Sequence, residues 1–176
     1  ANPFKIKGAI NVVYPNDGTE IFTVYDATDQ PTQYPITCTV SGPISQITLK
    51  YSKNSGSTWS NIGTIPTSGS GSIGSGDYLW SGSTGTFNWK VPNDAVSNGF
   101  SCVISITNTA DAMVGDDSNP AAPFKIRGKV VVTQHNGGAP DWKVGENRNI
   151  VWNQIGDFNV AIEYSTDDFA SDINVI

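Results

Sequence analysis

Apolar and polar residues alternate with a period of two along several stretches of the chain. Residues 47–51 place Ile, Leu and Tyr on one side and Thr and Lys on the other, and residues 87–91 and 100–106 follow the same pattern. Such alternation predicts strands with one buried face, and the Gly, Pro, Asn and Asp residues between them predict turns. No segment sustains the 3.6-residue period of an amphipathic helix. The pattern therefore predicts an all-β fold in which about seven short strands form two packed sheets.

A short motif occurs twice along the chain. Residues 3–8 read PFKIKG and residues 123–128 read PFKIRG, and each copy leads into a segment rich in Val. Further matches follow in the same order, of residues 36–38 with 150–152 and of residues 47–52 with 160–165. Several matches in one order indicate a duplicated structural unit.

The repeat divides the chain into three parts. Residues 1–7 are the end of a preceding repeat or a linker, residues 8–126 form one β-sandwich, and residues 127–176 form part of a second. We favour the interpretation that the chain is a fragment of a longer protein, because its N-terminus also falls at a repeat boundary. Alternatively, the remaining strands of the second unit are disordered or absent, or another chain supplies them as in donor-strand assembly.

One stretch within the first unit has a different composition. Residues 67–85 are rich in Gly and Ser, which predicts a flexible loop between strands. Tyr78 and Trp80 lie inside it. They either anchor the loop to the sandwich or form an exposed contact for a neighbouring molecule or a sugar.

A turn motif follows the strand predicted at residues 47–51. It consists of Ser52, Asn54, Gly56, Thr58 and Trp59. Asn can bond nearby backbone amides, and Gly adopts positive φ without steric strain, so this spacing predicts a β-hairpin turn. The motif resembles the Asp box of sialidase-type propellers, where it is a structural hairpin and not the catalytic site. The second unit keeps only the Ser and Asp of the motif, within residues 165–168.

Several segments together resemble a known kind of repeat. In order they read YSKNSGSTW (51–59), FNWKVP (87–92), SCVISI (101–106) and DWKVGENRNIVW (141–152). This is similar to the tandem immunoglobulin-like repeats of very large secreted or surface-layer proteins of bacteria and archaea. The resemblance implies tandem immunoglobulin-like β-sandwiches, the second incomplete, with a structural or adhesive role outside the cell. The chain departs from the family pattern at Cys38, where such repeats usually carry Trp.

The resemblance also bears on the cysteines. Cys38 and Cys102 lie on strands that would face each other across an immunoglobulin-like sandwich, which predicts a disulfide between them. The alternative is a pair of buried free thiols.

Acidic residues gather where the two units meet. Asp111, Asp116 and Asp117 supply the oxygen ligands that Ca²⁺ prefers, so an ion could stiffen the junction there. The spacing is not that of an EF-hand, and a solvated acidic turn is the alternative interpretation. No other cofactor is expected.

Composition and charge exclude several functions. The net charge is −6 and no basic stripe is present, which argues against nucleic acid as a partner. No run of apolar residues is long enough for a membrane span. A single His and two Cys give neither a metal cluster nor a Cys–His nucleophile pair, and no catalytic motif occurs, so we assign no catalytic residues.

These observations predict a structural, non-enzymatic segment of an extracellular cell-surface protein such as a surface layer, sheath or filament. Its expected partners are other copies or repeats of the same protein, and its mechanism is assembly through domain packing. The alternative is an adhesion or carbohydrate-binding module of a secreted protein, with cell-surface glycans as partners.

Overall fold

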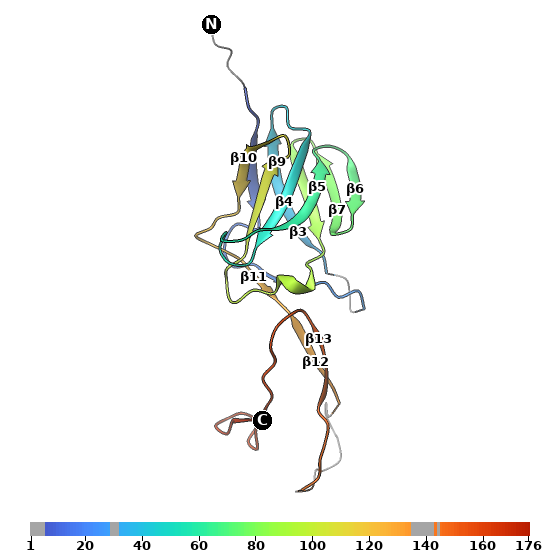
Figure 1. The fold of residues 1–176 in the computed structure, drawn as a ribbon, viewed down its shortest axis with the longest axis vertical. Helices are drawn as coiled ribbons and strands as arrows, with labels where there is room; N and C mark the ends of the chain where they lie inside the picture. The colour runs from blue at the N-terminus through green and yellow to red at the C-terminus, as the bar shows by residue number, and fades with distance from the viewer. Residues whose placement is uncertain (1–5, 29–31, 135–142, 144) are drawn as a thin grey trace.

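The computed structural model describes residues 6–28, 32–134, 143 and 145–176, and within them the chain is all-β as predicted (Figure 1). The first unit is a sandwich of two antiparallel sheets. One sheet has the order β1-β3-β8-β7-β6 and the other the order β10-β9-β4-β5. The first sheet comprises β1 (Ala9–Tyr14), β3 (Tyr34–Ser41), β8 (Thr84–Trp89), β7 (Gly76–Ser81) and β6 (Ser70–Ile73); the second comprises β10 (Asp111–Asp117), β9 (Val103–Asn108), β4 (Gln46–Ser52) and β5 (Ser60–Pro66).

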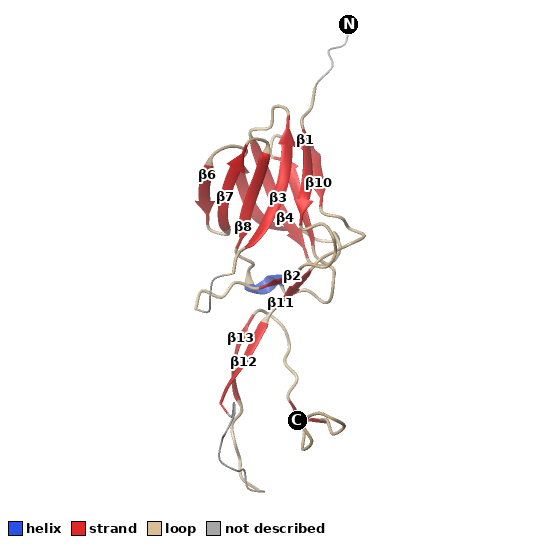
Figure 2. Cartoon of the chain, turned by 180° about the vertical axis from the view of Figure 1, so that it is seen from behind, coloured by secondary structure: helices blue, strands red, loops and turns tan. Residues whose placement is uncertain are grey.

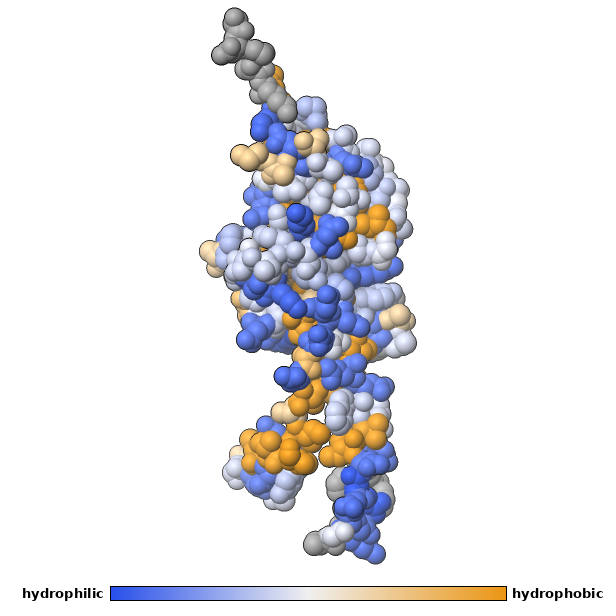
Figure 3. Space-filling view, viewed as in Figure 1, coloured by the Kyte–Doolittle hydropathy of each residue, from blue (hydrophilic) through white to orange (hydrophobic). Residues whose placement is uncertain are grey.

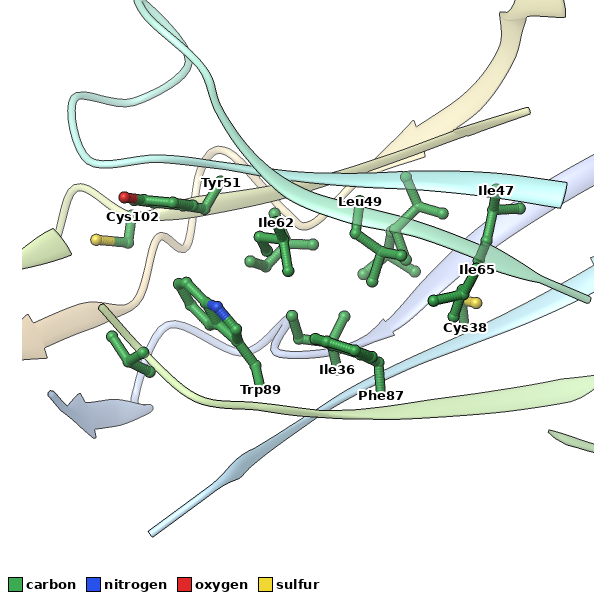
Figure 4. Close-up of a cluster of buried hydrophobic side chains, with 14 of the residues drawn as sticks. Ile36, Cys38, Ile47, Leu49, Tyr51, Ile62, Ile65, Phe87, Trp89 and Cys102 are labelled. Carbon is green, nitrogen blue, oxygen red and sulfur yellow. The ribbon is translucent and has the colours of Figure 1, made fainter. Parts of the chain in front are cut away.

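The inward-facing side chains of the two sheets form one apolar core (Figure 4). Alternate residues of β4 are buried, as the sequence pattern predicts, and those of β8 face them from the opposite sheet. Tyr51 of β4 and Trp89 of β8 meet across the core, with ring centroids 5.1 Å apart. Each such pair removes apolar surface from water, which is the main driving force for packing the two layers.

The stretch predicted as a flexible loop, residues 67–85, is instead mostly strand. It forms β6, β7 and the start of β8, which extend the first sheet to its edge. Aromatic rings cover the glycines: Tyr78 lies directly opposite Gly71, and Trp80 lies opposite Gly85. A side chain at either glycine would collide with the facing ring, so Gly and an aromatic residue fit here as cross-strand pairs.

A short parallel pair and a 3₁₀ turn close one end of the sandwich. They are β2 (Ile21–Thr23), which pairs with β11 (Lys125–Arg127), and η1 (Asn93–Ala95). The second unit lies beyond this end in both ribbon views (Figures 1 and 2). It contains β12 (Lys129–Gln134) paired with β13 (Val151–Ile155), and β14 (Glu163–Tyr164) paired with β15 (Asn174–Val175).

The β12–β13 pair reproduces the β1–β3 pair residue for residue. Val12 pairs with Cys38 in the first unit, and Val132 pairs with Trp152 in the second. Each ladder then shifts register immediately after the Val. Because a one-residue slip would turn every side chain to the opposite face, a shared register and shared irregularity show that both pairs are built on the same plan.

The second unit exposes apolar residues that the first unit buries. Val12 is buried, whereas its counterpart Val132 is exposed; likewise, Tyr51 is buried and Tyr164 is exposed. Figure 3 shows apolar residues gathered over this part of the molecule. Within the described residues, no second layer covers β12 and β13. No helix among these residues is long and apolar enough to cross a membrane.

Candidate assembly site at the end of the first unit

The repeated motif at residues 123–127, called the strap below, packs into the core at one end of the sandwich. Its strand β11 runs parallel to β2, with Ile126 paired to Phe22. Phe124 is 1% exposed and Ile126 is 0% exposed. The Phe124 ring lies 4.8 Å from the ring of Phe22, centroid to centroid. The strap is therefore part of the core of the first unit, although it immediately precedes the second.

The backbone of the strap is also hydrogen-bonded on its other side. The Phe124 amide donates to the Cys102 carbonyl at 3.0 Å, and the Cys102 amide donates back to Phe124 at 2.9 Å. The Ser97 amide donates to the Ile126 carbonyl at 3.0 Å, while the Ile126 amide donates to Ser97 Oγ, also at 3.0 Å. A strand that is hydrogen-bonded along both edges is held in one register. The buried side chains of Phe124 and Ile126 then hold the strap in the core.

A buried carboxylate shapes the loop that leads into β2. Glu20 accepts backbone hydrogen bonds from Asn16 at 2.7 Å, Asp17 at 3.2 Å and Gly18 at 3.0 Å. Its own carbonyl accepts the amide of Lys125 at 3.0 Å. Glu20 thus folds its loop and begins the pairing of β2 with the strap. Alternation patterns do not reveal this role, which depends on three amides converging on one side chain.

The glycine that follows each copy of the motif permits a close backbone approach. A Cβ placed on Gly8 would lie 2.5 Å from the Ser41 carbonyl oxygen and 2.7 Å from the Ile44 side chain. A Cβ on Gly128 would collide with Phe158 and lie 2.8 Å from the Ile155 carbonyl oxygen. In each unit, the glycine therefore lets the chain pass close to the end of the strand that pairs with the first strand. That strand ends at Ser41 in the first unit and at Ile155 in the second.

Side chains of the first unit contact the second unit at a joint. Val96, next to the strap, would lie 2.8 Å from a Cβ placed on Gly156, and the Asp157 amide donates to the Asn93 carbonyl at 2.9 Å. Lys129 and Asp26 form a 3.8 Å ion pair across the same boundary. The second unit therefore starts against the end of the first, with direct contacts between them.

The predicted hairpin motif forms a closed network of hydrogen bonds. The hydroxyl of Ser52 donates to Asn54 Oδ1 at 2.9 Å and accepts the Gly56 amide at 2.8 Å. Asn54 Oδ1 also accepts the Thr58 amide at 2.8 Å. Gly56 has a φ of 85°, as the turn requires, and Trp59 flanks the turn partly exposed. All of these contacts are local, so they account for the turn itself and indicate no ligand.

The same network occurs in the second unit with different residues. Ser165 Oγ donates to Asp167 Oδ1 at 2.8 Å and accepts the amide of Phe169 at 2.8 Å. Phe169 adopts a φ of 60°, in the position that Gly56 holds in the first unit. Hydrogen bonds, chiefly from the Ser171 hydroxyl, lower the pKa of Asp167 to about 2. In the sequence only the Ser and Asp of the motif are retained here, because Phe169 and Ser171 stand where the first unit has Gly56 and Thr58.

The predicted disulfide between Cys38 and Cys102 is wrong. Both cysteines are free and buried, and Figure 4 shows them at opposite ends of the core. Cys102 lies near Tyr51 and Trp89, whereas Cys38 is four residues along β3 from Tyr34, the partner of Trp89. Four residues of strand span about 13 Å, well beyond the roughly 7 Å between Cα atoms that a disulfide tolerates. Burial raises the pKa of the Cys38 thiol to about 11 and also raises that of Cys102.

The three acidic residues considered for calcium are engaged separately. Asp111 forms a 2.9 Å ion pair with Lys7, and Asp116 accepts the Val12 amide at 2.8 Å, linking the edges of the two sheets. Asp117 follows Asp116 on β10, so it points to the opposite face of the strand. Across the part of the chain that the structure describes, no three His, Cys, Asp or Glu side chains are arranged to hold a metal ion. The predicted calcium cluster is therefore not formed.

The two aromatic residues considered for external contacts serve the fold. Trp80 is only 9% exposed and belongs to the core, while Tyr78 is partly buried and packs against that core. The anchoring interpretation of the pair therefore applies, and Trp80 is not an exposed contact. The exposed residue between them, Leu79, is not aromatic.

Comparisons with known proteins identify no family for the chain. No protein-family model matches it, and no curated protein is similar to it at a significant level.

Proposed function

We propose that this chain is a structural, non-enzymatic repeat segment of an extracellular cell-surface protein, such as a surface layer, sheath or filament. It acts by assembly, and its partners are other repeats or copies of the same protein. Immunoglobulin-like repeats of large surface proteins, which the sequence resembles, have this kind of role.

The observation that carries this proposal is the strap joining the two units. The strap completes the core of the first unit, and only Gly128 separates it from β12 of the second unit. Tension along the chain would pass through a strand held by hydrogen bonds on both edges, not through a slack linker. A continuous load path of this kind suits a protein whose role is mechanical.

The shared register of β1–β3 and β12–β13 supports the same proposal. Units built on one plan and joined by one kind of contact can be stacked with a fixed geometry, as in other repeat proteins. The low charge content and the hydroxyl-rich outer strands suit a surface that packs against neighbours.

Immunogold electron microscopy on the source cells tests this function. An antibody raised against the first unit should label the outside of intact cells, over a regular layer, sheath or filament. Brief protease treatment of intact cells should remove the signal, while a cytoplasmic marker survives as the matched control. Labelling confined to the cell interior would contradict the proposal.

A further inference from the structure

A polar groove lies on the outer face of the second sheet, over β9 and β10, which Figure 1 views from the front. Its volume is about 550 Å³, which falls within the range of ligand pockets. A bulge in β10 forms one wall: Asp111 pairs with Asn108, but the next pair is Gly115 with Thr107, so the residues between them leave the ladder. The segment that follows β10 forms the opposite wall. All of the lining belongs to residues 105–120, well inside the first unit.

The floor of the groove contains a buried hydroxyl without a partner. Ser105 alternates with Ile104 and Ile106, which face the core, so its side chain points out of the sheet and into the groove. Ser105 is only 9% exposed, yet its hydroxyl forms no hydrogen bond with any described residue. The other buried polar side chains of the described chain are all hydrogen-bonded, namely Glu20, Ser52, Ser97 and Ser118. Because buried hydroxyls are normally paired, that of Ser105 is placed to receive a group from outside.

A carboxylate lies directly beside this hydroxyl. Asp117 pairs with Ser105 across the β9–β10 ladder, so the two side chains share the outer face with their Cβ atoms about 5 Å apart. Asp117 is exposed and forms no hydrogen bond or ion pair with the described residues, whereas Asp111 on the same strand holds Lys7 at 2.9 Å. Lys50 of β4 stands on the other side of Ser105 and does not line the groove. The groove therefore carries a negative charge that no cation of its described lining balances.

The remaining lining adds a second hydroxyl and aliphatic surface. Thr107 supplies the hydroxyl, and Gly115 opposite it keeps the floor open, because a Cβ there would lie 2.8 Å from the Thr107 methyl group. Met113, which is 87% exposed, and Pro120 line the walls. Among the described lining residues there is no Lys, Arg or His to receive an anion, and no aromatic ring on which a sugar could stack. Such a groove suits a cation that is rich in donors and has an aliphatic stem.

We propose that this groove binds a basic side chain, Lys or Arg, presented by another polypeptide. The ammonium or guanidinium group donates to the Asp117 carboxylate and to the Ser105 hydroxyl, which are acceptors within reach of one cationic group. The methylene stem of the basic side chain packs on Met113 and Pro120. This contact goes beyond the proposed structural role, because its chemistry is the same wherever the chain is located.

An NMR titration of the isotope-labelled full chain tests the groove. A Gly-Lys-Gly-Lys-Gly peptide should shift the amide signals of Ser105, Thr107 and Gly115, with saturation at about millimolar peptide. A Gly-Gln-Gly-Gln-Gly peptide and the neutral sugar maltose should leave these signals in place. No shift with the Lys peptide, shifts spread over the whole chain, or shifts with maltose alone would each overturn the proposal.

Two variants and a matched control separate the groove from general attraction to an acidic protein. Asp117→Asn should weaken binding of the Lys peptide at least about tenfold, since it removes the charged acceptor. Ser105→Ala should weaken it about fivefold, since it removes the buried hydroxyl. Glu163→Gln removes the same charge from an exposed strand of the second unit and should leave the affinity unchanged. Signals outside the groove report that each variant is folded, and equal weakening by Asp117→Asn and Glu163→Gln would show diffuse attraction and overturn the site.

Discussion

Replacing Phe124 with Ala should destabilise the first unit even though this residue lies just before the second. The side chain is 1% exposed and packs on the Phe22 ring. Removing a fully buried Phe side chain typically lowers the free energy of unfolding by about 3–5 kcal/mol, through lost burial and the cavity that remains. Both edges of the strap backbone are hydrogen-bonded, which limits how far the strap can move to fill that cavity.

Calorimetry provides the assay, with Phe100→Ala as the matched control. A change of 1 kcal/mol shifts the midpoint of a chain of this size by about 2–4 °C. Phe124→Ala should therefore lower the midpoint of the first unit by roughly 10 °C. Phe100 is 47% exposed, so its substitution should change the midpoint far less.

The reasoning would be refuted by equal midpoints for the two variants. Such a result would mean that the strap is a linker lying on the sandwich and not part of its core. A large loss in Phe124→Ala alone would instead show that the two units share structural material at their boundary.

Three further predictions concern single side chains. Glu20→Gln should lower the free energy of unfolding by about 1–3 kcal/mol in urea denaturation, since a neutral amide replaces a charged acceptor of three backbone amides; an unchanged midpoint would contradict this role. In an NMR titration, Asp167 should protonate near pH 2, so its turn is stabilised fully above the ordinary value of 3.8 and loses this support as the pH falls through 2; a midpoint at 3.8 would show that the Ser171 bond is absent in solution. Cys38 and Cys102 should resist thiol reagents in the native protein and both react after unfolding without reductant; an unreactive pair would reveal a disulfide.

Alternation of apolar residues was sufficient to predict the strands at the centre of the sandwich. β4 and β8 each bury one face against the opposite sheet, and such strands carry the strongest period-two signal. The edge of the first sheet carries no such signal, because β6 consists of Ser, Gly and a single Ile. Its strands depend on rings from β7 covering glycines on neighbouring strands, and this cross-strand fit cannot be recognised from the composition of residues 67–85 alone.

The failed disulfide has a related cause. Placing Cys38 and Cys102 on facing layers specifies their sheets but not their positions along the strands. Cys102 lies near the Tyr51–Trp89 contact at one end of the core (Figure 4). Trp89 pairs with Tyr34, and Cys38 lies four residues further along β3 from Tyr34. The position of each cysteine along the sandwich depends on how the strands are paired in register, which alternation within a single strand does not determine.

The two hairpin turns show why the duplication extends further in structure than in sequence. Each turn is closed by a Ser hydroxyl and an Asn or Asp side chain that accept amides four or five residues further along the chain. These bonds go to backbone groups, so the residue that supplies each amide can change. Phe169 can then occupy the positive-φ position of Gly56, with an energetic cost that the network offsets. A backbone-directed network is therefore preserved where residue identities are not.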